Sequence, residues 1–271
     1  MAEGIADDWD DDGPGSPWSL FDEMSPSPKM TPASLHAPPI SGLFFTPSLL
    51  LPCEMADQVT QFCLKNYFRD AGVNQIMLFG VASPSGAITS GLPPPLVALL
   101  STMSTLLEPS LPPEIHALIF PHKPTRARQA ILNLYLPGEG IIPHVDLLKR
   151  FGDGIVGISL GSSCVMQFAR VKEVDKDVSP LQLFLPERSM VVLSGDARYE
   201  WTHGIEKRTA DLVAEAGSHR EVQRGVRLSI TFRWLLPGAD VVGKDDNDVI
   251  RLGDVQLAPQ TQPGPGILRS T

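Results

Sequence analysis

The chain has 271 residues, 42% of them hydrophobic, and a formal net charge of −9. This length suits one or two domains with a sizeable core, and the acidity argues against broad, nonspecific binding of polyanions. No apolar run reaches the roughly 18 residues of a membrane span, and residues 1–12 lack the basic-then-apolar pattern of a signal peptide.

The three cysteines (Cys53, Cys63 and Cys164) are too few and too scattered for a disulfide framework or a zinc cluster. They indicate reduced, mostly buried thiols. We therefore expect an intracellular protein of the cytoplasm, the nucleus or both, neither secreted nor held in a membrane, and monomeric.

Residues 1–40 are rich in Asp, Pro and Ser and show no sustained periodicity. Such a composition buries too little apolar surface to offset the chain entropy, so we predict a disordered tail. Trp9 and Trp18 stand among acidic residues in this tail. They indicate either an ordinary solvated segment or a short peptide that docks in a groove of a protein partner.

A single domain is predicted over residues 41–238, with a mostly disordered second tail over 239–271. In its first half the patterns indicate supporting helices and the first strands. These are a strand at 43–45, a helix at 48–68, an edge strand or ordered lid at 74–80, a helix at 93–107 and a strand at 130–135.

The second half predicts many short strands separated by turn residues, which is typical of an all-β sandwich or barrel. The strands are expected at 154–160, 165–170, 181–185, 189–194 and 227–234. Residues 206–224 are polar and charged without a clear period, so they are predicted as a long excursion between strands.

A candidate metal site comes from His144, Asp146 and His203. Two imidazoles and one carboxylate can occupy three adjacent positions around iron(II) and leave the opposite positions open. His144 and Asp146 are two apart, so on an extended segment both side chains leave one face. Taken alone, a His-x-Asp pair more often marks a solvated loop.

The strand at 227–234 places Arg227, Ser229, Thr231 and Arg233 on one face. This face is either an exposed charged edge or the wall of a site. If it points inward, the arginines need anionic partners, and their fork geometry suits a small dicarboxylate. Asn133 and Tyr135 share a face in the same way and are neutral donors to carboxylate oxygens, although Tyr135 alone is also an ordinary strand aromatic.

Five motifs, in this order, resemble the AlkB family of iron(II)/2-oxoglutarate dioxygenases over about residues 43–236. They are Asn133-x-Tyr135, Pro137-Gly-x-Gly140, His144-x-Asp146, Trp201-Thr-His203-Gly-Ile205 and Arg227-x-Ser-x-Thr-Phe-Arg233. The resemblance implies a mostly β (α+β) fold, a double-stranded β-helix or jelly-roll barrel with N-terminal helices packed on one side.

The same resemblance implies the role of each matching residue. His144, Asp146 and His203 would hold Fe(II), and Tyr135 and Arg227 would bind the distal carboxylate of 2-oxoglutarate. At the metal-bound end of 2-oxoglutarate, Asn133 and Arg233 would make contact, and Ser229 stands where many relatives have Asn. O₂ and 2-oxoglutarate would be consumed, CO₂ and succinate released, and a substrate C–H hydroxylated, with loss of formaldehyde if that carbon is an N-methyl group.

Two features bear on the substrate. The run Leu147-Leu-Lys-Arg150 after the metal motif replaces acids common in members that repair methylated bases. Three motifs are most similar to the member that hydroxylates a modified wobble uridine in tRNA: Arg198-Tyr-x-Trp-Thr-His-Gly-Ile205, Gly157-Ile-Ser-Leu-Gly-Ser162 and Asn74-Gln75. We therefore expect oxidation of a modified base in nucleic acid, with RNA or tRNA slightly favoured over DNA. A protein side-chain hydroxylase or demethylase and a non-catalytic interaction protein on the same barrel remain alternatives.

Residues 74–80 resemble the nucleotide-recognition lid of the family. Substrate contacts are expected from Asn74, Gln75, Met77 and Phe79. Four cations are the candidates for contact with phosphates or, alternatively, ordinary surface charge: Arg126, Arg128, Lys149 and Arg150.

Overall fold

The computed structural model describes residues 31–80, 91–171, 179–239 and 256–257. Two antiparallel sheets contain most of the strands in these residues. The larger sheet runs in the order β1 (Leu43–Leu50), β8 (Ser189–Leu193), β5 (Ile155–Leu160), β12 (Arg227–Trp234), β3 (Arg128–Tyr135), β2 (Gln75–Gly80) and β13 (Gln256–Leu257). The smaller sheet runs in the order β4 (Ile141–His144), β9 (Trp201–Ile205), β6 (Cys164–Arg170) and β7 (Leu181–Leu185).

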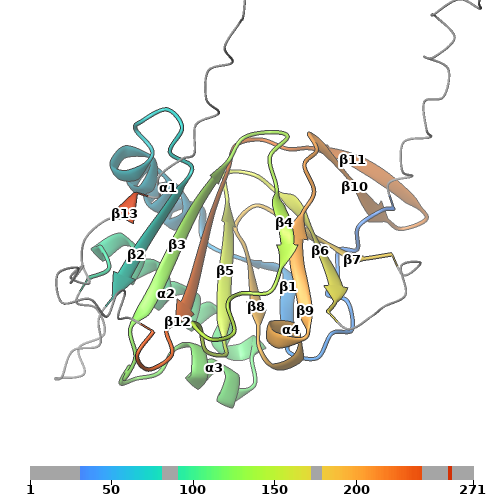
Figure 1. The fold of residues 1–271 in the computed structure, drawn as a ribbon. Coiled ribbons are helices and arrows are strands. Elements are labelled where there is room, and N and C mark those ends of the chain that lie inside the picture. The colour runs from blue at the N-terminus through green and yellow to red at the C-terminus, as the bar shows by residue number, and fades with distance from the viewer. Residues whose placement is uncertain (1–30, 81–90, 172–178, 240–255, 258–271) are drawn as a thin grey trace, which may run out of the picture. The chain divides into compact units, whose positions relative to one another are not determined.

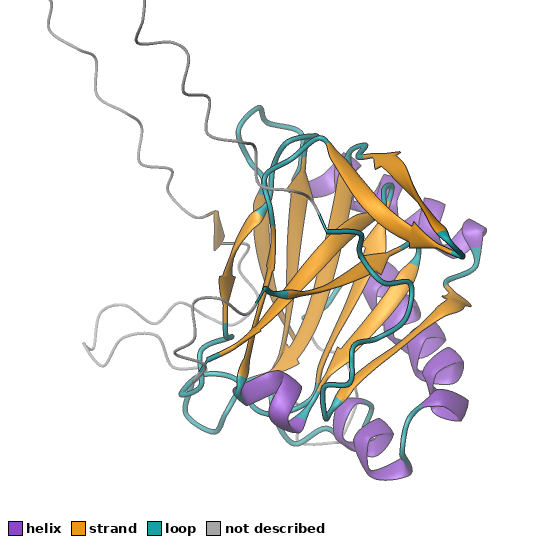
Figure 2. Ribbon diagram, turned by 90° about the vertical axis from the view of Figure 1, so that its right-hand side faces the viewer, coloured by secondary structure: helices purple, strands orange, loops and turns teal. Residues whose placement is uncertain are grey.

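Helices cover one face of the larger sheet, and the smaller sheet lies over its other face (Figures 1 and 2). The helices are α1 (Cys53–Tyr67), α2 (Pro94–Leu107), the 3₁₀ turn η2 (Glu108–Ser110) and α3 (Pro113–Ile119), with α4 (Gly195–Tyr199) leading into β9. No helix in the described ranges is long and apolar enough to span a membrane.

The two faces of the larger sheet differ because side chains alternate along each strand. On β12, Leu228, Ile230 and Phe232 are buried in the core shared with α1 and α2. The intervening residues of β12 point toward the smaller sheet. On the neighbouring strand β3, Tyr135 pairs in register with Arg227 and Gln129 with Arg233. One strand therefore builds the hydrophobic core with one face and a polar cavity wall with the other.

The predicted fold class is confirmed: the chain is mostly antiparallel β, with helices packed on one side. In the described residues the strands pair as three separate sheets, the third of only two strands, and they do not close into a barrel. Residues 43–45, 75–80 and 130–135 lie in strands, and Asn74 precedes β2. The helix expected at 48–68 begins only at Cys53, since β1 continues to Leu50.

The predicted excursion at 206–224 was wrong, because it contains a hairpin of β10 (Ala210–Glu215) and β11 (Ser218–Gln223). The period-two pattern is hidden by a charge at an inward position. Asp211 is buried and accepts hydrogen bonds from Arg208 at 2.7 Å and Arg224 at 2.6 Å. Asp211, buried and paired with two arginines, therefore occupies an inward position of β10 where the alternating pattern of a strand requires an apolar residue.

The predicted domain boundary at residue 40 is late. Ala33 is fully buried, its N–H donates to the Leu212 carbonyl at 2.8 Å, and Ser34 N–H donates to the Gln182 carbonyl at 3.0 Å. In the second predicted tail, Gln256–Leu257 pairs with the outer edge of β2. Residues 1–30, with Trp9 and Trp18, lie outside the described residues, as do 240–255 and 258–271.

Candidate active site

The two candidate histidine ligands face each other across neighbouring strands. His144 ends β4 and pairs in register with His203 of β9, and their ring centroids are 4.5 Å apart. His144 Nδ1 lies 2.9 Å from the Ile142 carbonyl, which accepts only. Nδ1 therefore carries the proton when this bond forms, and the Nε2 lone pair remains for another partner.

Two glycines of the quoted motifs allow this close approach of β4 to β9. A Cβ on Gly204 would lie 2.8 Å from the Pro143 backbone, and one on Gly140 would lie 2.1 Å from the Ile205 carbonyl oxygen. Any larger residue at either position would push the two strands apart. The glycines of these motifs thus bring His144 beside His203.

Asp146 completes the group from the loop that follows β4. Its side chain is buried, with Oδ2 4.0 Å from His203 Nε2. Oδ1 accepts a hydrogen bond from the Arg233 guanidinium. Arg233 also donates to the Gln129 side chain at 2.7 Å, and its guanidinium lies 3.7 Å from the centre of the Phe151 ring.

The donor set fits a divalent transition metal in kind. Burial lowers the pKa of His203 to about 4, against the opposing effect of Asp146, so its imidazole is neutral at pH 7 and has a lone pair. Within the described residues, however, no three His, Cys, Asp or Glu side chains form a closed metal-binding group. One oxygen of the Asp146 carboxylate is paired with Arg233.

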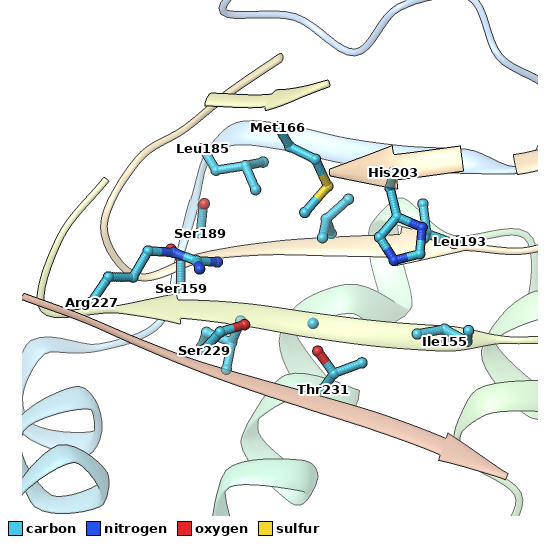
Figure 3. A pocket seen from close by; sticks show the side chains of 13 residues that line it. Ile155, Ser159, Met166, Leu185, Ser189, Leu193, His203, Arg227, Ser229 and Thr231 are labelled. Atoms are coloured by element: carbon cyan, nitrogen blue, oxygen red, sulfur yellow. The ribbon is translucent and has the colours of Figure 1, made fainter. Parts of the chain in front are cut away.

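Arg227 lies at the other end of the inward face of β12. It is buried, donates from Nε to the Ser159 hydroxyl at 2.6 Å, and its guanidinium lies 5.4 Å from the centre of the Tyr135 ring. Figure 3 shows Arg227, Ser229 and Thr231 along one wall, with His203 across the pocket. No acidic side chain pairs with Arg227 among the described contacts, so this buried cation is available to an anion.

The predicted cosubstrate and substrate residues divide between those that line the cavity and those that do not. Asn133 and Tyr135 line it, as do Gln75 and Met77, and Gln75 donates to the Asn133 side chain at 2.8 Å. Asn74 and Phe79 are not among the lining residues. Asn74 is exposed and its carbonyl accepts from Leu134 N–H.

Phe79 packs against a small buried cluster of Ala127, Phe151 and Leu235. Its ring therefore supports the wall of the cavity without forming its lining.

Arg128, expected to contact phosphates, is buried and its guanidinium lies 3.8 Å from the centre of the Trp234 ring. It donates to the Ile119 carbonyl, and burial lowers its pKa to about 9. Arg128 is thus a core residue and is not accessible to a nucleic acid backbone. Lys149 is exposed, and Arg126 lies beside Gly152, close to the loop that carries Asp146.

For three residues that contact the site, the sequence analysis predicted no role. They are Gln129, Phe151 and Arg198. The period-two alternation that places Asn133 and Tyr135 also places Gln129 on the inward face of β3, so its position was accessible to sequence reasoning. Phe151 lies in a loop and Arg198 in a short helix, where the alternation of side chains along a strand cannot predict their direction.

Comparison with known proteins defines the class. The 2OG-Fe(II) oxygenase superfamily model matches residues 82–233, more than half of the chain. The chain therefore belongs to the 2OG-Fe(II) oxygenase superfamily. Within it, the predicted membership of the AlkB family of 2-oxoglutarate-dependent dioxygenases is confirmed.

Three curated relatives illustrate the similarity. Over 124 residues (41% of this chain, 18% of the relative) the chain is 39% identical to "tRNA (carboxymethyluridine(34)-5-O)-methyltransferase ALKBH8" of Macaca fascicularis. Over 102 residues (38% and 43%) it is 39% identical to mouse "Alpha-ketoglutarate-dependent dioxygenase alkB homolog 7, mitochondrial". Over 150 residues (47% and 66%) it is 27% identical to "N6-methyladenosine RNA demethylase ALKBH" of Cryphonectria parasitica.

The chain thus covers less than half the length of the macaque and mouse relatives, and about two thirds of the fungal one.

Proposed function

We propose that this chain oxidises a modified base in RNA, by hydroxylation or demethylation, with Fe(II), 2-oxoglutarate and O₂. The observation that carries the proposal is the single cavity lined by His144, Asp146 and His203 at one end of β12 and by Arg227 at the other. Such a cavity offers a metal-type donor set and a buried cation to one small molecule with a carboxylate at its far end.

Within this proposal, each lining residue has a defined task. Fe(II) held by His144, Asp146 and His203 would supply the activation of O₂. Arg227 and Tyr135 bind the distal carboxylate of 2-oxoglutarate, since both donate into the same corner of the cavity. Asn133 and Arg233 contact the metal-bound part of the cosubstrate, and Ser229, which pairs in register with Asn133, lines the wall beside it.

Overall, one oxygen atom of O₂ enters the substrate as hydroxyl and the other enters succinate as CO₂ leaves.

RNA is supported by the names of two of the relatives. One concerns a carboxymethyluridine at tRNA position 34 and another an N6-methyladenosine RNA demethylase. In this chain, Gln75 and Met77 of β2 reach the cavity beside Asn133 and present an amide and a polarisable thioether to an incoming base. Exposed Lys149, three residues after Asp146, is the nearest free cation along the chain for a phosphate.

A second candidate, a protein side-chain hydroxylase, is favoured by exposed aliphatic side chains in the segment that carries His144 and Asp146. In the segment 136–148, four large aliphatic side chains are exposed: Leu136, Ile142, Leu147 and Leu148. Of the described residues that line the cavity, the two with phenyl-type rings are Tyr135 and Phe151, and a guanidinium lies against each. A flipped base would thus find few free aromatic faces for stacking, whereas an apolar peptide segment would find exposed aliphatic side chains on the segment beside the metal-type donors.

The experiment that separates the two is succinate release by the full chain, with Fe(II) and 2-oxoglutarate, on modified tRNA, methylated RNA, methylated DNA and cell protein. Asp146→Ala is the matched control for nonenzymatic oxidation. Succinate above the substrate-free rate with a modified RNA, and loss of that signal in the control, would support the RNA proposal. Stimulation by cell protein alone would replace it with the second candidate.

A further inference from the structure

Arg198 is a charged residue that is almost completely buried. Only 2% of it is exposed, and it is the largest of the fully buried side chains among the described residues. All three of its guanidinium nitrogens donate to backbone carbonyls: Nη1 to Asp146 at 3.0 Å, Nη2 to Phe151 at 3.1 Å and Nε to Gly152 at 3.3 Å. A buried cation with this coordination fixes the backbone that surrounds it.

The position of Arg198 in the fold gives these bonds their significance. It belongs to the short helix α4, which leads through Glu200 directly into β9 and thus to His203. The three carbonyls belong to the loop that begins at Asp146. Arg198 therefore joins the segment that carries one candidate metal ligand to the segment that carries another.

A second connection ties the far end of the same loop to the same helix. The Asp153 carboxylate accepts from Gly195 N–H at 3.1 Å and from the Ser194 hydroxyl at 3.0 Å. With Arg198 at one end and Asp153 at the other, the loop 146–153 is held against α4 along its length. Asp146 itself is not part of a strand, so these bonds replace the strand ladder that places the histidines.

We propose that Arg198 is a positioning residue for the metal centre: it holds the Asp146 loop against the strand that carries His203. This inference rests on the proposed function, since it presupposes that Asp146 and His203 bind one metal. Lysine cannot replace the fork, because its single ammonium nitrogen reaches fewer than three carbonyls of fixed, divergent direction. Each carbonyl left without a donor is a buried, unpaired acceptor that drives the loop to rearrange.

The test measures the Mn²⁺ affinity of the full chain by calorimetry without oxygen, for wild type, Arg198→Met and Arg198→Lys. Outer-shell partners of metal ligands typically contribute roughly 10- to 100-fold to affinity, so we expect a rise in the Mn²⁺ dissociation constant in that range for Arg198→Met and a smaller rise for Arg198→Lys. Hydrogen exchange of the backbone amides at 147–152 should be faster in both variants than in wild type. This measurement is made without metal.

The matched control is Arg128→Met. Arg128 is likewise a buried arginine that donates to a backbone carbonyl, but it does so at Ile119 and beside Trp234, outside the cavity lining. This control should lower the melting temperature and leave the Mn²⁺ dissociation constant unchanged. If Arg198→Met does not fold, Arg198→Lys carries the comparison.

Failure of the inference is distinct from failure of the proposed function. A wild-type chain that binds no Mn²⁺ would contradict the metal site itself. A wild-type chain that binds Mn²⁺, with the same affinity in the Arg198 variants or an equal loss in Arg128→Met, would overturn the positioning role alone.

Discussion

The two faces of β12 are built from adjacent residues, yet they have opposite properties. Toward the helices the strand presents Leu228, Ile230 and Phe232, all within 1% of complete burial. Toward the smaller sheet it presents Arg227 and Arg233, each hydrogen-bonded to a polar neighbour and facing the cavity. A strand in the middle of the sheet can therefore anchor the fold with one row and hold the site with the other.

This difference teaches where tolerance to change is expected. The helix-facing row contributes through the apolar area that it removes from water, so its loss affects stability first. The cavity-facing row contains buried polar groups that are satisfied only in part within the protein, and such groups mark a functional site more often than a structural one. Variants in the two rows should consequently separate stability from ligand binding.

The largest expected effect comes from the metal end of the cavity. Asp146→Ala removes the one carboxylate of the candidate donor set and leaves Arg233 without its anionic partner. Because the proposed reaction requires the metal, we expect turnover of 2-oxoglutarate to fall to the background rate, and the same for His144→Ala. Turnover assays with Fe(II), together with metal content, check this. Wild-type turnover in either variant would remove the metal site from this cavity.

The next effect is on the helix-facing row. Phe232→Ala deletes a fully buried ring from the core and should lower the free energy of unfolding by about 3–5 kcal/mol. Thr231→Ala, its neighbour on the opposite face, is the matched control and should cost far less. Denaturant unfolding measures both. Equal losses in the two variants would show that the two rows do not divide as described.

Arg227→Lys tests the far end of the cavity-facing row. The variant keeps the charge and loses the bidentate fork, so binding of 2-oxoglutarate should weaken by about 1.5–3 kcal/mol, roughly a tenfold to hundredfold rise in its dissociation constant. Metal binding should persist, because Arg227 contacts Ser159 and Tyr135 and no candidate ligand. Anaerobic calorimetry with Mn²⁺ measures this affinity. An unchanged dissociation constant for 2-oxoglutarate would mean that its carboxylate binds elsewhere.

The smallest effect concerns residues 31–40. Deletion of residues 1–40 removes the backbone hydrogen bonds of Ala33 to the β10–β11 hairpin and of Ser34 to β7. The resulting loss of stability is partly offset, because the entropy cost of ordering residues 31–40 is also removed. A chain without residues 1–40 should therefore melt several degrees lower than one without residues 1–30, at about 2–4 °C per kcal/mol. Identical melting curves would mean that the first ordered residues contribute nothing to the fold.

The sequence predicts the residues on the strands of this site far better than those in its loops. Alternation along β12 and β3 places Arg227, Tyr135 and Arg233 correctly, because side-chain direction on a strand follows from sequence parity alone. Phe79 shows the limit of the same argument. It shares the face of Met77, yet it lies beyond the cavity, where Phe151 and Leu235 cover it.

The remaining differences arise from tertiary contacts that no local pattern encodes. The hairpin of β10 and β11 is masked by the buried Asp211, whose charge is neutralised by arginines on either side in the sequence. Arg198 shows neither apolar periodicity nor a ligand-type side chain, and only the folded loop reveals its three carbonyl partners. Arg128 likewise has the sequence features of a surface cation and is buried against Trp234.

The measurement that tests the central claim most directly is a calorimetric titration of 2-oxoglutarate into the wild-type chain without oxygen, with and without Mn²⁺. The cavity joins a metal-type donor set to a buried arginine, so the account predicts one 2-oxoglutarate per chain, bound more tightly when Mn²⁺ is present. Absence of 2-oxoglutarate binding in the presence of Mn²⁺, or an affinity indifferent to the metal, would contradict it.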